Sequence, residues 1–265
     1  MRARLSSLVL LLSSGVVLAA CSNLSGSEAQ PNRYGALNVQ ARNNGTTAAV
    51  GLATMIFFKG VNVSVPNSSN NQFDQCIISR IDTTTSATTG MNSVGSGLAL
   101  SIGARSVPMP YNSTTLRYES GANQVTYSSG ESVTISVPDG GAVFPLSTLT
   151  LKLAEPIVPG PLTLPAANAD WVVRWNGTGD GVSSIQLQLR YATSGSVSAP
   201  NEQVYCVLQD DGNVTIPASY LTGFLASPSA LRSMRLLRWR TNERVIDANT
   251  LLHLTSTIDT VVTFP

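Results

Sequence analysis

Alternation of apolar and polar residues in short runs, each followed by turn-forming residues, restricts this chain to β structure more strongly than any other pattern. In the first part of the chain the runs lie at 34–40, 48–58, 61–65, 76–81, 97–102, 115–119, 124–128, 132–137 and 147–153. Turn-forming clusters such as Asn43-Asn44-Gly45 and Pro138-Asp139-Gly140 separate them. A period of two is typical of strands that bury one face, so these runs predict an antiparallel β-sandwich.

The same alternation continues in the second part of the chain. Trp171, Val173 and Trp175 share one face of a predicted strand, which places two indole rings in or beside the core. Asp211-Gly212 is a strong hairpin signal before the next strand. Further strands are expected at 185–191, 204–208, 234–240 and 251–264, with a short helix at 217–225.

A proline-rich stretch suggests where one domain ends and another begins. Pro156, Pro159, Pro161 and Pro165 follow one another closely, and each lacks a backbone donor and has a fixed φ. We therefore expect two tandem antiparallel β-sandwiches, one at 33–155 and one at 156–265. The chain of 265 residues is long enough for two domains of this size.

The N-terminus has the pattern of an export signal. Arg2 and Arg4 precede an apolar stretch at 5–17, which is shorter than the ~20 residues that a spanning helix needs. The stretch ends in Leu18-Ala19-Ala20-Cys21, which resembles the lipobox of bacterial lipoproteins. The alternatives are an ordinary cleaved signal or a membrane anchor that ends in cysteine.

The lipobox resemblance implies where the protein works. Residues 1–20 would be the signal peptide, and Cys21 would become the first mature residue and carry a diacylglycerol and an amide-linked acyl chain. More than one chain is needed for stable anchoring. Ser22, where some lipoproteins have aspartate, implies transfer to the outer membrane. Residues 21–32 are small and polar and would form a flexible tether between the envelope and the folded part.

A second resemblance concerns the C-terminal part. Trp175, a glycine-rich turn, Tyr205-Cys206 and the stretch from Asp210 to Leu221 are similar to the immunoglobulin-like C-terminal modules of uncharacterised bacterial secreted lipoproteins. The similarity covers the chain from about Trp171 onwards. It implies that the tandem sandwiches are immunoglobulin-like and that the protein is secreted, and it implies no chemistry.

Composition excludes some classes of function. Charged residues make up 12% of the chain and the net charge is +1, so we expect no nucleic acid partner. The sequence shows neither metal-ligand spacing nor a cofactor motif, and we expect no metal and no cofactor.

Cys76 and Cys206 remain once Cys21 is lipidated. Export would allow a disulfide between them, worth about 4 to 5 kcal/mol in the loop-entropy model. The alternative is two buried thiols that act as small apolar residues. Cys206 has the same parity as Val204 and Leu208, which favours the buried thiols.

Five arginines form the one charge cluster: Arg232, Arg235, Arg238, Arg240 and Arg244. If Leu237 and Trp239 point inward, Arg238 and Arg240 share the outer face of a strand. There they would contact an anionic surface, such as lipid phosphates or acidic glycans. The plainer interpretation is that they guard a strand edge against aggregation.

Two further candidate sites are disfavoured by their residue patterns. His253 has the opposite parity to Leu252 and Leu254 and no Gly-x-Ser-x-Gly motif accompanies it, so a hydrolytic triad is disfavoured. Asp210-Asp211-Gly212-Asn213 contains acidic residues but lacks the spacing of a calcium loop, and turn chemistry is favoured.

These observations predict a lipid-anchored cell-envelope protein with a structural or binding role and no catalytic residues. Its expected partners are the membrane and a glycan or another envelope protein. A carbohydrate-binding or adhesive module is the first alternative, with Tyr111, Tyr118 and Tyr127 as candidate exposed aromatics. A hydrolase is the last alternative.

Overall fold

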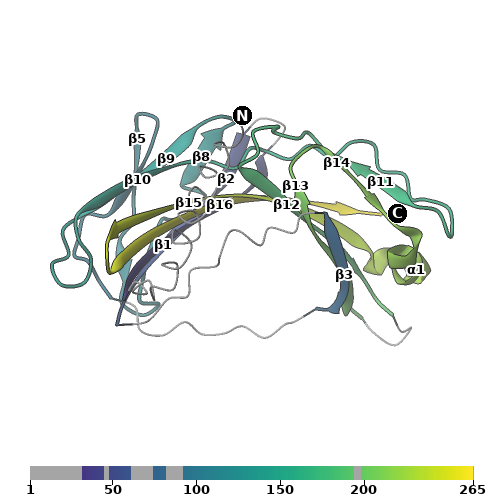
Figure 1. The fold of residues 1–265 in the computed structure, drawn as a ribbon, viewed down its shortest axis with the longest axis horizontal. Helices are drawn as coiled ribbons and strands as arrows, with labels where there is room; N and C mark the ends of the chain where they lie inside the picture. The colour runs from purple at the N-terminus through teal and green to yellow at the C-terminus, as the bar shows by residue number, and fades with distance from the viewer. Residues whose placement is uncertain (1–31, 45–47, 61–73, 82–91, 194–197, 265) are drawn as a thin grey trace, which may run out of the picture. The chain divides into compact units, whose positions relative to one another are not determined.

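A computed structural model describes residues 32–44, 48–60, 74–81, 92–193 and 198–264 (Figure 1). All of them belong to one compact unit, Pro31–Pro265. The described residues form strands and one short α-helix, which confirms the expectation of an all-β protein. Cys21, the signal segment, most of the tether and the run expected at 61–65 lie outside the described residues.

A ten-stranded sheet is the largest element of the fold. Its strand order is β3-β13-β12-β15-β16-β1-β2-β7-β6, and β8 also pairs with β2. The bounds are β1 (Arg33–Asn44), β2 (Ala48–Lys59), β3 (Gln75–Arg80), β6 (Tyr111–Asn112), β7 (Arg117–Glu119), β8 (Val125–Ser128), β12 (Ser183–Tyr191), β13 (Glu202–Gln209), β15 (Ser233–Asp247) and β16 (Thr250–Thr263).

Strand β1 joins the two ends of the described chain. It pairs antiparallel with β2 and parallel with β16. Leu37 lies opposite Met55 on β2 and Leu254 on β16, and all three side chains are buried. Period-two alternation thus places one apolar face of each strand against the same core.

Two smaller sheets cover that face. The first has the order β10-β9-β4-β5, with bounds β4 (Ala99–Ile102), β5 (Arg105–Pro108), β9 (Ser132–Val137) and β10 (Ser147–Lys152). The second pairs β11 (Trp171–Arg174) with β14 (Asn213–Ile216). Figure 1 shows β9 and β10 above one part of the large sheet, and β11 and β14 above another.

Helix α1 (Ala218–Ala226) follows β14 of the two-stranded sheet and confirms the short helix expected at 217–225. The 3-10 turn η2 (Ser229–Leu231) comes after it. Phe224 of α1 contacts Trp171 and Phe264, with ring centroids 6.1 and 5.7 Å away. Trp171 and Phe264 are themselves 5.7 Å apart. These aromatic rings anchor β11, α1 and the C-terminal end of the chain to one another.

The expected boundary at 155/156 does not separate two groups of strands. β1, β2 and β3 precede it, yet they lie in the same sheet as β12, β13, β15 and β16. The prolines do interrupt the strand ladders, as predicted, since β10 ends at Lys152 and β11 begins at Trp171, and the pairing in the proline-rich stretch is one isolated bridge between Pro159 and Trp175. However, the start of the stretch, residues 153–157, is buried, with Ala154 and Ile157 fully so, and it packs into the shared core instead of forming an exposed linker between two domains.

Candidate functional site

The two arginines expected on the outer face are buried. The exposed fractions of Arg238 and Arg240 are 0% and 1%, while Leu237 and Trp239 lie half-buried on the opposite face of β15. This overturns both interpretations of the pair, as an anionic-surface contact and as a guard of a strand edge. Desolvated guanidinium groups need anionic partners and hydrogen-bond acceptors around them, and the fold supplies both.

Arg238 binds Asp210 through two parallel hydrogen bonds. Its Nε donates to Asp210 Oδ2 at 2.7 Å and its Nη2 donates to Oδ1 at 3.0 Å. Nη1 donates to the backbone carbonyls of Glu155 and Pro156 at 2.9 and 3.2 Å, and Nη2 also donates to the carbonyl of Asn176. One side chain of the large sheet therefore holds the proline-rich crossover, the segment after β11 and the end of β13.

Asp210 accepts hydrogen bonds from three further side chains. Trp175 Nε1 donates to Oδ1 at 2.9 Å, and Ser183 Oγ and Thr178 Oγ1 donate to Oδ2 at 2.6 and 3.2 Å. A Cβ at Gly177 would lie 2.7 Å from the nitrogen of Gly212, so only glycine allows this close approach of the two segments.

The expectation of turn chemistry at Asp210–Asn213 agrees with this arrangement. The oxygens of Asp210 face donors, and Asp211 Oδ1 accepts the backbone N–H of Asn213 at 3.3 Å. Among the described residues, no group of three His, Cys, Asp or Glu side chains comes together in a way that could hold a metal ion.

Arg240 binds two carboxylates from different segments. Its Nε and Nη2 donate to Glu155 Oε2 at 3.0 and 2.9 Å, and Nη2 also donates to Asp180 Oδ2, at 2.5 Å. Lys152 Nζ lies 2.7 Å from Glu155 and 3.4 Å from Asp180. We call the set of Arg238, Arg240, Asp210, Glu155, Asp180 and Lys152 the junction network.

The charges of the junction network shift one another's pKa values. Burial raises the pKa of Asp180, but hydrogen bonds from Arg240 and the backbone of Val182 outweigh it and hold that pKa well below its ordinary value. Burial also raises the pKa of Glu155, and hydrogen bonds that include one from Lys152 bring it below its ordinary value. Both carboxylates are therefore ionised in the folded protein at neutral pH.

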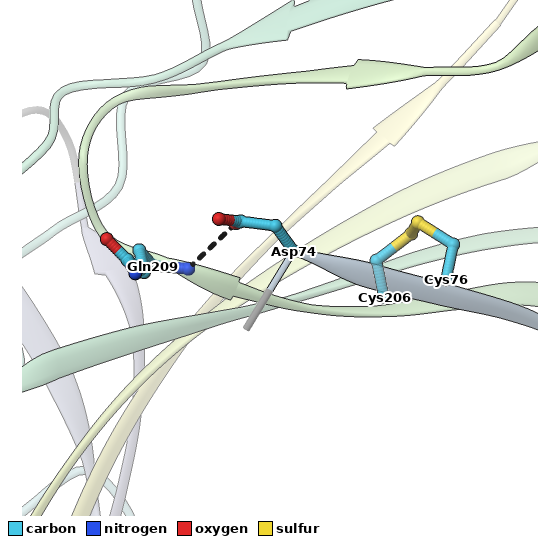
Figure 2. The surroundings of a disulfide bond; sticks show 4 residues. All are labelled: Asp74, Cys76, Cys206 and Gln209. Carbon is cyan, nitrogen blue, oxygen red and sulfur yellow. Dashed lines mark hydrogen bonds between the residues drawn. A yellow bond between two sulfur atoms is a disulfide. The ribbon is translucent and has the colours of Figure 1, made fainter. Parts of the chain in front are cut away.

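Cys76 and Cys206 form a disulfide between β3 and β13 (Figure 2). The two residues lie directly opposite each other in the register, with their Cα atoms 4.1 Å apart. The parity argument correctly placed Cys206 in the core, where it is fully buried. It favoured separate thiols, however, because parity says nothing about which residue lies on the neighbouring strand, and that preference was wrong.

His253 lies on the open face of the large sheet, opposite the face that the small sheets cover. Its Nδ1 is 2.6 Å from Glu243 Oε1, and its Nε2 is 2.8 Å from Thr255 Oγ1. A carboxylate, an imidazole and a hydroxyl thus follow one another in hydrogen-bond order, an arrangement that the sequence analysis missed. Glu243 lies directly across from His253 on β15, and only the strand register reveals this.

The open face also contains two cavities, of about 370 and 320 Å³. The first is lined in part by Gln40, Leu52, Arg235, Leu237, Thr257 and Asp259. The second is lined by Ala36, Leu37, Asn38, Thr54, Ile56, Arg117, His253 and Thr255. Arg235 Nε donates to Asp259 Oδ2 at 2.9 Å within the first cavity.

The candidate glycan-binding tyrosines do not form an exposed row. Tyr118 and Tyr127 are 1% and 3% exposed. The Tyr118 hydroxyl donates to the carbonyl of Gly95 at 2.6 Å, and the Tyr127 hydroxyl donates to that of Ala154 at 3.0 Å. Tyr111 is half-buried and packs on Tyr118, with ring centroids 5.0 Å apart.

Comparison with known proteins adds little. No family model matches the chain, and no curated protein matches it. Among solved structures it is similar to the yeast delta-COP-I mu-homology domain, with a TM-score of 0.28 and 8% identity over 85% of this chain and 94% of that one. A TM-score this low carries no argument about function. No helix among the described residues is long and apolar enough to span a membrane.

Proposed function

We propose that this protein is a lipid-anchored component of the bacterial cell envelope with a structural or binding role and without catalysis. In this proposal residues 1–20 are removed, Cys21 carries the lipid and residues 21–32 tether the folded unit to the outer membrane. The expected partners are the membrane and a glycan or another envelope protein.

The observation that carries the proposal is the Cys76–Cys206 disulfide. Disulfides persist in oxidising compartments outside the cytosol and are rare within it. The bridge is therefore independent support for the export that Leu18-Ala19-Ala20-Cys21 suggests. The buried part of the junction network also supports a non-catalytic role, because Arg238 and Arg240 are bound to Asp210 and Glu155 within the core.

Labelling with radioactive palmitate in a bacterial host tests the anchor. The wild-type chain should incorporate the label and sediment with membranes, whereas Cys21→Ala should lose both properties because it lacks the thiol that receives the lipid. A chain with Cys76→Ala and Cys206→Ala is the matched control, and it should keep the label. Label on the Cys21→Ala chain, or none on the wild type, would contradict the proposal.

A carbohydrate-binding role is the second candidate, and one observation favours it. Trp239 lies half-buried on the open face, in a cross-strand row with Thr257 and Gln40. An indole ring beside hydroxyl and amide groups is suited to a sugar, which presents both an apolar face and hydroxyls.

A glycan array with the purified full chain tests this second role. Trp239→Ala should abolish any glycan signal, whereas Val261→Ala should not, because Val261 lies on the same face outside that row. Melting curves of both variants check that the sheet is intact. Equal glycan binding by the wild type and Trp239→Ala would remove the open face from consideration.

The proposed lack of catalysis is tested at Glu243, His253 and Thr255, because the same order of groups activates the nucleophile of serine hydrolases. Hydrolysis of p-nitrophenyl acetate by the full chain should proceed at the same rate with wild type, His253→Ala and Thr255→Ala. A rate for the wild type that both substitutions lower by about a hundredfold or more would make the protein an esterase.

The expectation of two tandem immunoglobulin-like sandwiches is not part of the proposal. Strands from both sides of residue 155 share the ten-stranded sheet. A binding role therefore belongs to one folded unit and not to a separable C-terminal module.

A further inference from the structure

The outer edges of the sheets differ in how they are protected. Strand β6 has only two residues, and β5 begins with Arg105 and ends with Pro108. Along β10, the carbonyls of Thr148 and Thr150 accept hydrogen bonds from Arg244 and Asn242, at 3.0 and 2.7 Å. Short length, charge, proline and capping side chains are the usual means of keeping an edge from pairing with another chain.

Among the described residues, strand β3 is longer than β5 and β6, has no proline, and has its single charge, Arg80, at its last position. It has six residues, it contains neither proline nor lysine, and it ends the strand order of the large sheet. Ile77 and Ile78 are 57% and 51% exposed. Successive residues point to opposite faces, so both faces of the sheet have an exposed isoleucine at this edge.

The disulfide identifies the backbone groups that point away from β13. The Cα distance of 4.1 Å between Cys76 and Cys206 is that of a non-hydrogen-bonded antiparallel pair. The N–H and C=O groups of Cys76 therefore face away from β13, and the same alternation applies to Ile78 and Arg80. The outer edge presents donors and acceptors at these three positions to a further strand.

Asp74 and Arg80 place opposite charges at the two ends of this edge. Both are exposed, and neither has an ion-pair partner among the described residues. Asp74 Oδ1 accepts the backbone N–H of Gln209, the last residue of β13, at 3.3 Å, which holds the exposed carboxylate just before the start of β3 (Figure 2). An edge with an acid at one end and a base at the other is complementary to an antiparallel copy of itself.

We propose that β3 pairs edge to edge with β3 of a second copy of this chain, in an antiparallel register centred on Ile77. In this register Ile77 lies opposite Ile77 of the second copy. Cys76 lies opposite Ile78 of that copy, so their free backbone groups bond across the twofold axis. Asp74 lies beside Arg80 of the second copy, and symmetry produces this ion pair twice.

The disulfide prepares β3 for this contact. It ties the strand to β13 at its second residue, so the edge is ordered before a partner arrives and little conformational freedom is lost on association. The dimer would join two ten-stranded sheets into one continuous sheet.

Charge reversal tests the register. Sedimentation velocity of the purified full chain should show a concentration-dependent dimer, and Asp74→Arg or Arg80→Asp should raise its dissociation constant by at least about tenfold, because each places like charges side by side. The double variant, Asp74→Arg with Arg80→Asp, should dimerise like the wild type. If the double variant is as weak as the single variants, the proposed register is wrong.

Cross-linking tests the centre of the register. Opposite non-hydrogen-bonded residues have Cα atoms about 4.5 Å apart, within the range of a disulfide. Ile77→Cys should therefore give a covalent dimer on a non-reducing gel, joined at position 77 by peptide mapping. Ser79→Cys is the matched control on the same face, because the two copies of position 79 would lie about 13 Å apart.

Three results would overturn the proposal. One is a wild-type chain that stays monomeric at every concentration, and a second is equal cross-linking at positions 77 and 79. The third is slow hydrogen exchange at the amides of Cys76 and Ile78 in the monomer, which would mean that another segment of the same chain already pairs with this edge.

Discussion

The junction network and the Cys76–Cys206 disulfide both connect segments that are far apart in the sequence, but they act on different states of the chain. Arg238 and Arg240 donate hydrogen bonds to the carboxylates of Asp210 and Glu155 only when the core is formed. The disulfide closes a loop with a separation of 130 residues, and this restricts the unfolded chain as well. The network makes its contribution in the folded state, and the bridge makes its contribution largely in the unfolded state.

Removal of the disulfide should have the largest effect on stability. For a separation of 130 residues, the chain-entropy model predicts that Cys76→Ala with Cys206→Ala lowers the free energy of unfolding by about 5 kcal/mol. Urea denaturation of the purified chain measures this. The near-ultraviolet circular dichroism below the transition should stay unchanged, and a loss of that signal would show that the bridge acts on the folded state instead.

Arg238→Met should be the next largest effect. It leaves the buried carboxylate of Asp210 without its cation, and breaking a buried ion pair from one side costs about 3 to 5 kcal/mol. The free energy of unfolding from urea denaturation is the measurement. A second substitution, Asp210→Leu, should cost much less in the Arg238→Met background than alone. If the decrease in the free energy of unfolding for the double variant equals the sum of the decreases for the two single variants, the two side chains are not coupled.

Low pH should reduce the stabilisation from the junction network and leave that from the disulfide unchanged. The folded pKa values of Asp180 and Glu155 lie below their ordinary values of 3.8 and 4.5. Their stabilisation is complete above those values and is lost as pH falls below them. Below about pH 4 the free energy of unfolding should fall less steeply with decreasing pH in Asp180→Asn than in the wild type. The difference in slope should be at most about 1.4 kcal/mol per pH unit, the value for one titrating group. Urea denaturation at a series of acidic pH values measures this, and an equal dependence of the free energy of unfolding on pH in variant and wild type would contradict it.

Arg235→Ala should have the smallest effect. Arg235 lies on the same strand as Arg238 but on the open face, and its side chain and that of Asp259 are 32% and 17% exposed. Partly exposed pairs contribute about 0.2 to 1 kcal/mol. A cost as large as that of Arg238→Met, measured by the same urea denaturation, would erase the distinction between the two faces of β15.

The fold class followed from the sequence, but the faces of β15 did not. The segment from Met234 to Arg240 has apolar residues at 234, 236, 237 and 239. Each of its two alternating faces therefore has two apolar residues, and the pattern does not show which face is buried. The prediction took Leu237 and Trp239 as inward, which placed Arg238 and Arg240 on the outer face. That choice was wrong because Asp210 and Glu155 neutralise them, and their positions in space depend on tertiary structure.

Local sequence patterns could not predict the domain organisation either. A proline-rich stretch predicts an interruption of strand pairing, and the interruption is present between β10 and β11. Nothing local distinguishes an exposed linker from a buried crossover. The difference arises from the carbonyls of Glu155 and Pro156, which accept hydrogen bonds from an arginine more than 80 residues later.

The parallel pairing of β1 with β16 has a consequence for biogenesis. Strand β1 pairs at once with β2, but it finds its parallel neighbour β16 only after all the strands between them have been synthesised. Until then the β1–β2 hairpin has an unpaired flank and an apolar face without its cover, and contacts between sequence-distant strands form slowly. Loss of β16 would therefore separate β15 from β1 and split the sheet through its middle.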